Sequence, residues 1–91
     1  MKEHILKYIE LNPNRGYYDL CKIFGLSIED LLTLLDINNY KIDKFNILRF
    51  YDKNNKIIYR EYSNGEWKKY KYDVNNNLTY KEDSDGNKHK F

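Results

Sequence analysis

The amino-acid sequence predicts an α+β fold of one domain, in which an N-terminal three-helix segment (residues 1–40) packs on a C-terminal five-stranded antiparallel β-meander (residues 44–91). Three observations predict this class. Apolar residues in the first segment recur at the spacing of a helix face. From Lys44 onward, apolar and polar residues alternate, and turns rich in Asn and Gly recur at short intervals. The stretches 51–71 and 72–91 are two copies of one 21-residue unit, which suits a hairpin with its connection.

The first helix is expected over residues 2–11. Ile5, Leu6 and Ile9 fall on one stripe of such a helix, and Pro13 follows soon after it. Because proline disfavours the helical conformation at the residue before it, the helix should end near residue 11.

Two shorter helices are expected on either side of Gly25, which can adopt the left-handed conformation found at helix ends. Ser27, with Asp30 three residues later, is typical of a helix start, where the serine side chain caps a free backbone N–H. The apolar positions of this helical pair are Leu20, Cys21, Phe24, Leu31, Leu32, Leu34 and Leu35.

Residues 17–36 resemble a helix-turn-helix, and the resemblance implies, as one alternative, a DNA-binding transcription regulator. The positions that would face the major groove are Ser27, Ile28, Glu29, Leu32, Thr33 and Asp36. Carboxylates and leucines there repel phosphates and read few base edges, so the favoured interpretation is a helical pair that covers a sheet. We expect the helix at about residues 28–35 to bury the sheet face that bears Tyr59, Tyr72 and Tyr80.

Five strands are expected in the C-terminal part. They span about residues 45–52, 56–62, 66–73, 77–83 and 87–91. The turns between them are rich in Asn and Gly, which accept a positive φ at little cost.

Each copy of the 21-residue unit begins with Tyr-Asp, at residues 51–52 and 72–73, and has a glycine turn in its middle, at Gly65 and Gly86. Over about residues 50–91 these units resemble the YD repeats of Rhs-type proteins. Rhs proteins build shells from long arrays, and two units cannot enclose anything. Short runs similar to these occur in small phage and mobile-element proteins, so the resemblance implies that context.

Alternation along the strands predicts two sheet faces of different character. The inner face should hold Tyr51, Ile57, Tyr59, Tyr70, Tyr72, Leu78, Tyr80 and Phe91. The outer face should present a partner-binding set of Arg60, Tyr62, Trp67, Lys69, Lys71, Lys81 and Lys88, with Tyr62 and Trp67 as a cross-strand pair. Residues 41–91 carry twelve basic against eight acidic side chains, which suits an acidic or phosphate-bearing partner. The alternative is an ordinary solubilising surface, with Trp67 covered by a neighbouring loop or chain.

Little in the sequence favours catalysis or a cofactor. Cys21 is the only cysteine, which excludes an internal disulfide, and with His4 and His89 alone it makes no zinc ligand set. Neither histidine has a neighbouring nucleophile in a known motif. The repeated carboxylates, Glu61 and Glu82 among them, are expected to cap turns or pair with lysines. No signal peptide or membrane span is expected, so the chain should work in the cytoplasm.

A small chain with no catalytic motif and a phage-like repeat indicates a non-enzymatic binding protein. We expect a phage or mobile-element inhibitor, of the kind that anti-CRISPR proteins represent, which occupies the surface of a host protein or nucleoprotein complex. No cofactor, metal or membrane is expected to take part. The chain is expected to be a monomer or a homodimer.

Overall fold

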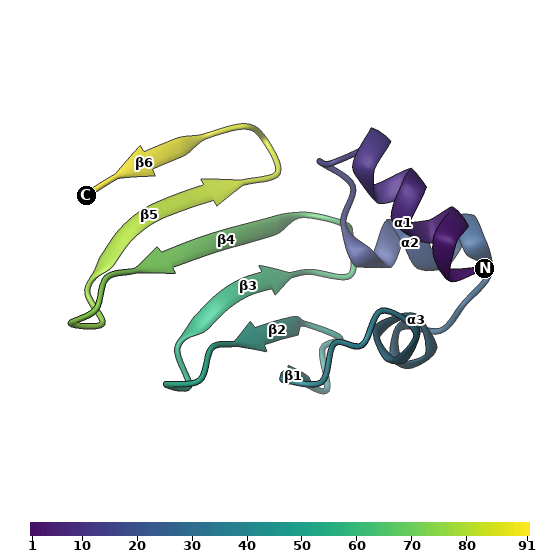
Figure 1. Ribbon diagram of the computed structural model, residues 1–91, viewed down its shortest axis with the longest axis horizontal. Helices are drawn as coiled ribbons and strands as arrows, with labels where there is room; N and C mark the ends of the chain where they lie inside the picture. Colours follow the sequence, from purple (N-terminus) through teal and green to yellow (C-terminus); the bar gives the residue numbers. More distant parts are fainter.

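The computed structural model describes all 91 residues and places three helices beside a six-stranded antiparallel sheet (Figure 1). The helices are α1 (Lys2–Leu11), α2 (Tyr17–Phe24) and α3 (Ile28–Leu34). The strands are β1 (Tyr40–Ile42), β2 (Leu48–Tyr51), β3 (Ile57–Glu61), β4 (Trp67–Tyr72), β5 (Leu78–Asp83) and β6 (Lys88–Lys90). Each strand pairs with the next along the chain. The predicted α+β class is confirmed, but the sheet has six strands where five were expected.

The strand that was not expected is β1. It has only three residues, too few for an alternating pattern to show. It pairs with β2 in the register Tyr40 with Phe50, Lys41 with Arg49 and Ile42 with Leu48. Residues 45–47, expected at the start of a strand, instead complete the turn between β1 and β2.

The helices pack around a core of their own. Ile5, Leu20 and Leu31, one from each helix, are almost completely buried against one another. The predicted signals for the helical pair are confirmed: Ser27 Oγ accepts a hydrogen bond from the N–H of Asp30 at 3.1 Å, and Gly25 ends α2 with a φ of +66°. The N-terminal part therefore has a small apolar core of its own, to which all three helices contribute.

All five hairpin turns have the same geometry. In each turn the N–H of the first residue donates to the carbonyl of the fifth, its carbonyl accepts from the N–H of the fourth, and the fourth has a positive φ. The turns start at Asp43, Asp52, Tyr62, Asp73 and Asp83, and their positive-φ residues are Asn46, Asn55, Gly65, Asn76 and Gly86. In the four turns that start with Asp, its Oδ1 accepts two further backbone N–H groups. The recurring Asp, Asn and Gly are therefore turn formers.

The repeat extends to the irregularities of the sheet. The strand pairing shifts between Phe50 and Tyr51, and it shifts again at the equivalent place in the second copy, between Lys71 and Tyr72. Such bulges bend a strand and increase its twist. Both hairpins therefore bend at the same point along their length.

The helices lie at one end of the sheet rather than across its face (Figure 1). Tyr59 is buried, but Tyr72 and Tyr80 are only half-buried. The expectation that one helix covers all three tyrosines is therefore wrong. One reason is register, which places Tyr72 on the face opposite Tyr59 and Tyr80. The other is size: the seven residues of α3 make a helix about 10 Å long, whereas six strands make a sheet about 24 Å wide.

Candidate partner-binding site

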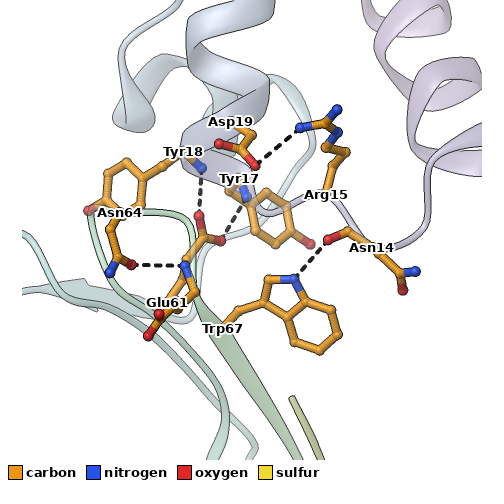
Figure 2. A network of polar contacts seen from close by, with 9 residues as sticks. Asn14, Arg15, Tyr17, Tyr18, Asp19, Glu61, Asn64 and Trp67 are labelled. Carbon is orange, nitrogen blue, oxygen red and sulfur yellow. Dashed lines mark hydrogen bonds and ion pairs between the residues drawn. The ribbon is translucent and has the colours of Figure 1, made fainter. Parts of the chain in front are cut away.

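Glu61, at the end of β3, joins the sheet to the helical part (Figure 2). Its side chain is completely buried, and its carboxylate oxygens accept hydrogen bonds from the backbone N–H groups of Tyr17 at 2.7 Å and Tyr18 at 2.8 Å. The hydroxyl of Tyr59 donates a third bond at 2.6 Å. Tyr17 and Tyr18 begin α2, and its N-cap residue, Gly16, has no side chain that could cap the helix. Glu61 therefore caps α2 from the sheet, where a carboxylate also suits the helix dipole.

Because of this cap, no residue larger than glycine fits at position 16 without a shift. A Cβ atom on Gly16 would lie 2.6 Å from Oε2 of Glu61 and 2.8 Å from Oε1. Burial raises the pKa of Glu61 above its ordinary value, although the three hydrogen bonds act in the opposite direction. Burial, followed by the charge of the nearby Glu61, also raises the pKa of Tyr17 and of Tyr59. Both phenols therefore stay neutral in this cluster.

Four aromatic rings cover the sheet next to the Glu61 cap. Phe50, Tyr59 and Trp67 lie on adjacent strands and stack in order, with ring centroids 5.1 and 6.1 Å apart. Tyr17 meets Phe50 and Tyr59 edge-on, at 5.2 and 5.5 Å. The Nε1–H of Trp67 donates to the carbonyl of Asn14 at 3.0 Å (Figure 2). Trp67 is only 2% exposed, and it fixes the segment before α2 to the sheet.

The residues expected on one outer face are divided between the two faces of the sheet. Strand pairing places Trp67, Lys69, Lys71 and Lys88 on the face that the helices touch, and Arg60 and Lys81 on the opposite face. The expected pair of Tyr62 with Trp67 is wrong, because the turn spans residues 62–66 and Trp67 pairs with Glu61. A slip of one residue moves every side chain of a strand to its other face. Tyr62 itself is half-buried at the start of that turn.

The sheet face that bears Phe50, Tyr59 and Trp67 is hollowed, and we call this feature the inner hollow. It has a volume of about 980 Å³. Phe50, Ile58 and Tyr59 line it from the sheet, and Pro13 and Leu20 line it from the helical part. A largely apolar hollow of this size is typical of a site that receives part of another molecule.

Lysines beside the inner hollow form no ion pair, although Glu82 lies opposite Lys69 on the next strand. Of the nine Lys and Arg side chains in the strands, only Arg49 makes an ion pair. The Nζ atom of Lys69 lies 4.7 Å from the centroid of the Trp67 ring, and that of Lys71 lies 5.2 Å from the centroid of the Tyr80 ring. The two lysines thus rest on aromatic rings while their exposed charges stay free to meet an anion.

One of the positions expected to face a DNA major groove is not on the surface. Leu32, expected to face the major groove, is completely buried. Glu29 and Asp30 stand in the first turn of α3, and no basic residue stands in its last turn. The exposed side of α3 therefore offers carboxylates rather than cations.

The role of Glu61 was not predicted, since turn capping or pairing with lysine was expected. Its repeat equivalent, Glu82, is half-buried and accepts a hydrogen bond from the Tyr80 hydroxyl at 3.2 Å. The copies differ in their cross-strand neighbours, which are Leu48 and Trp67 beside Glu61 but Lys69 and Lys88 beside Glu82. That difference is visible in the sequence only when the strand register is known.

No protein-family model, curated protein or solved structure matches the chain. None of the three helices has the length and apolar character that crossing a membrane requires. No group of three or more His, Cys, Asp or Glu side chains is placed to hold a metal ion. The function is therefore inferred from the geometry and charge of the site.

Proposed function

We propose that this chain is a small non-enzymatic binding protein of a phage or mobile element. It acts in the host cytoplasm by occupying an acidic or phosphate-bearing surface of a host protein or nucleoprotein complex, as an anti-CRISPR inhibitor does. The observation that supports the proposal most is the pair of exposed lysines at the inner hollow, Lys69 and Lys71, which have no ion pair within the chain. Both lysines lie on β4, within the first of the two YD-like units.

Free lysines next to an apolar hollow suit binding for two physical reasons. Their charges attract an anionic partner over about 10 Å at moderate ionic strength, which speeds association. The hollow then supplies apolar surface, and burial of that surface slows dissociation. A surface that serves only solubility needs the charges, but it does not require an apolar hollow beside them.

Affinity capture tests the proposal. The tagged protein and its Lys69→Glu/Lys71→Glu variant are incubated with lysates of several bacteria, and the retained proteins are identified by mass spectrometry. A host partner that the unmodified protein retains, that the variant loses and that is released as salt rises would support the proposal. A partner retained equally by both, or no partner above background in any lysate, would contradict it.

A DNA-binding regulator is the second candidate, because Gly25 turns the chain between α2 and α3 as a helix-turn-helix requires. Glu29 and Asp36 are exposed and oppose an approach to phosphates. Fluorescence anisotropy with random duplex DNA at physiological salt separates the two candidates. Tight binding of one sequence would favour the regulator. Binding that appears only after Glu29→Lys and Asp36→Lys would show that the native helix does not read a groove.

A further inference from the structure

We infer that the inner hollow receives an acidic, amphipathic segment of a protein partner. Apolar side chains of that segment enter the hollow, and its Asp or Glu side chains meet the lysines at the edge. The inference rests on the proposed function, to which it adds a site and a class of partner.

The apolar part of the inference comes from the walls of the hollow. Phe50 and Ile58 line the sheet side and remain half-exposed, so they offer apolar surface that nothing in the chain covers. Val74, in the turn between β4 and β5, also lines the hollow, with 97% of its surface exposed. An isolated apolar residue on a surface is ordinary, but Val74 stands at the edge of an apolar hollow. The equivalent position in the first copy is Lys53, so the turn itself does not require an apolar residue.

The charge of the partner follows from the groups at the edge of the hollow. Lys69, Lys71 and Lys53 all line it, are exposed and make no ion pair. Two carboxylates also line it, those of Asp52 and Asp73, but the Oδ1 of each accepts two backbone N–H groups of its own turn. Glu82 lies opposite Lys69 on β5 without forming an ion pair with it, and neither Lys53 nor Lys71 has a paired carboxylate. The cations therefore remain able to meet charges that a partner supplies.

The aromatic rings favour a protein segment over a nucleic acid. Single-stranded nucleic acids bind by stacking bases on free aromatic faces. Here Trp67 is 2% exposed and Tyr59 is 6% exposed, because their rings stack on each other. The half-exposed ring of Phe50 is already stacked on Tyr59 and meets Tyr17 edge-on. Aliphatic and phenyl side chains flanked by carboxylates match the hollow better than bases do.

Four defined probes test the class of ligand. They are an 18-residue amphipathic helical peptide of Leu, Phe and Glu, its counterpart with Lys in place of Glu, its counterpart with Ser in place of Leu and Phe, and a 20-nucleotide oligothymidylate. Calorimetry gives each affinity, and the fluorescence of Trp67, the one tryptophan of the chain, reports binding at the hollow. We expect the acidic amphipathic peptide to bind at least about tenfold more tightly than each of the other three.

Matched variants test the position of the site. Val74→Ser removes an exposed apolar side chain at the hollow, and Phe91→Ser removes a larger one, 71% exposed, that does not line it. The first should weaken the acidic amphipathic peptide about fivefold, and the second should change its affinity less than about twofold.

Each remaining outcome contradicts the inference in a distinguishable way. Equal effects of the two variants, or equal binding of the Ser-substituted acidic peptide, would show that apolar contacts in the hollow do not contribute to binding. The proposed function would then remain. Tighter binding of the oligothymidylate would make the partner a nucleic acid. If no anionic probe binds and affinity capture also fails, the proposed function falls together with the inference.

Discussion

Gly16 and Glu61 lie in such close contact that a Cβ atom on Gly16 would stand 2.6 Å from Oε2 of Glu61. The contact joins the N-terminus of α2 to the end of β3. It sets how the helical part sits against the sheet, and therefore where Leu20 lines the inner hollow.

Gly16→Ala should lower the free energy of unfolding by about 1–3 kcal/mol, since the added methyl group overlaps the buried carboxylate. Gly25→Ala is the matched control. It places a methyl group in open space and costs only the left-handed backbone conformation, about 1–2 kcal/mol. Urea unfolding measures both. In a Glu61→Ala background the cost of Gly16→Ala should largely disappear while that of Gly25→Ala persists, and equal persistence of both would disprove the steric link.

Glu61→Gln should lower the free energy of unfolding by about 2 kcal/mol, because an amide NH₂ replaces one of two oxygens that accept backbone N–H groups. The penalty should depend on pH. Burial raises the pKa of Glu61 in the folded state, so its contribution is greatest below its ordinary pKa and falls as the pH rises through the folded value. Unfolding curves from about pH 4 to about pH 7 should show a larger difference between the two proteins at the acidic end. A difference that grows toward neutral pH would contradict the direction of the shift.

Trp67→Ala should destabilise the fold by about 3–5 kcal/mol, since it removes a buried ring and its hydrogen bond to Asn14. Trp67→Phe should cost less, because a ring remains to stack on Tyr59. Native tryptophan emission should be short in wavelength and resistant to acrylamide. A freely quenched tryptophan, together with an unchanged urea midpoint for the alanine variant, would instead place Trp67 on an exposed surface.

Cys21 should react slowly with thiol reagents. Burial, and next the charges of Glu61 and Glu29, raise the pKa of its thiol to about 11. At pH 8 only about one thiol in a thousand would then be ionised. The reaction rate with a disulfide reagent should rise at least about tenfold on unfolding in urea. A native rate equal to the unfolded rate would identify a reactive cysteine.

Local signals predicted most of the elements. Ser27 and Gly25 mark their helix boundaries through side-chain and backbone chemistry that acts within a few residues. Asn55 and Asn76 mark their turns for the same reason, because each takes the left-handed conformation. Such signals do not depend on the rest of the fold.

The site could be predicted only in part, because it depends on register and on docking. Trp67 pairs with Glu61 and not with Tyr62, and this shift of one residue moves Trp67 from the expected outer face to the opposite face, where it is buried. The contact of Glu61 with Gly16 joins segments far apart in the chain, so no local pattern shows it. Lys69 and Lys71 share a face with Trp67, as expected. Arg60 and Lys81 were expected on that face too, but they lie on the opposite one.

The measurement that tests the central claim most directly compares the affinity of the captured partner for the Lys69→Glu and Lys68→Glu variants. Both lysines are exposed and adjacent on β4, and each lies opposite a carboxylate on β5, Lys69 opposite Glu82 and Lys68 opposite Asp83. The two substitutions therefore change the same charge in similar surroundings, but on opposite faces of the sheet. If the sheet face with the inner hollow binds the partner, Lys69→Glu should weaken binding at least about tenfold and Lys68→Glu less than about threefold. Equal weakening, or a greater loss with Lys68→Glu, would contradict the assignment of this face as the binding surface.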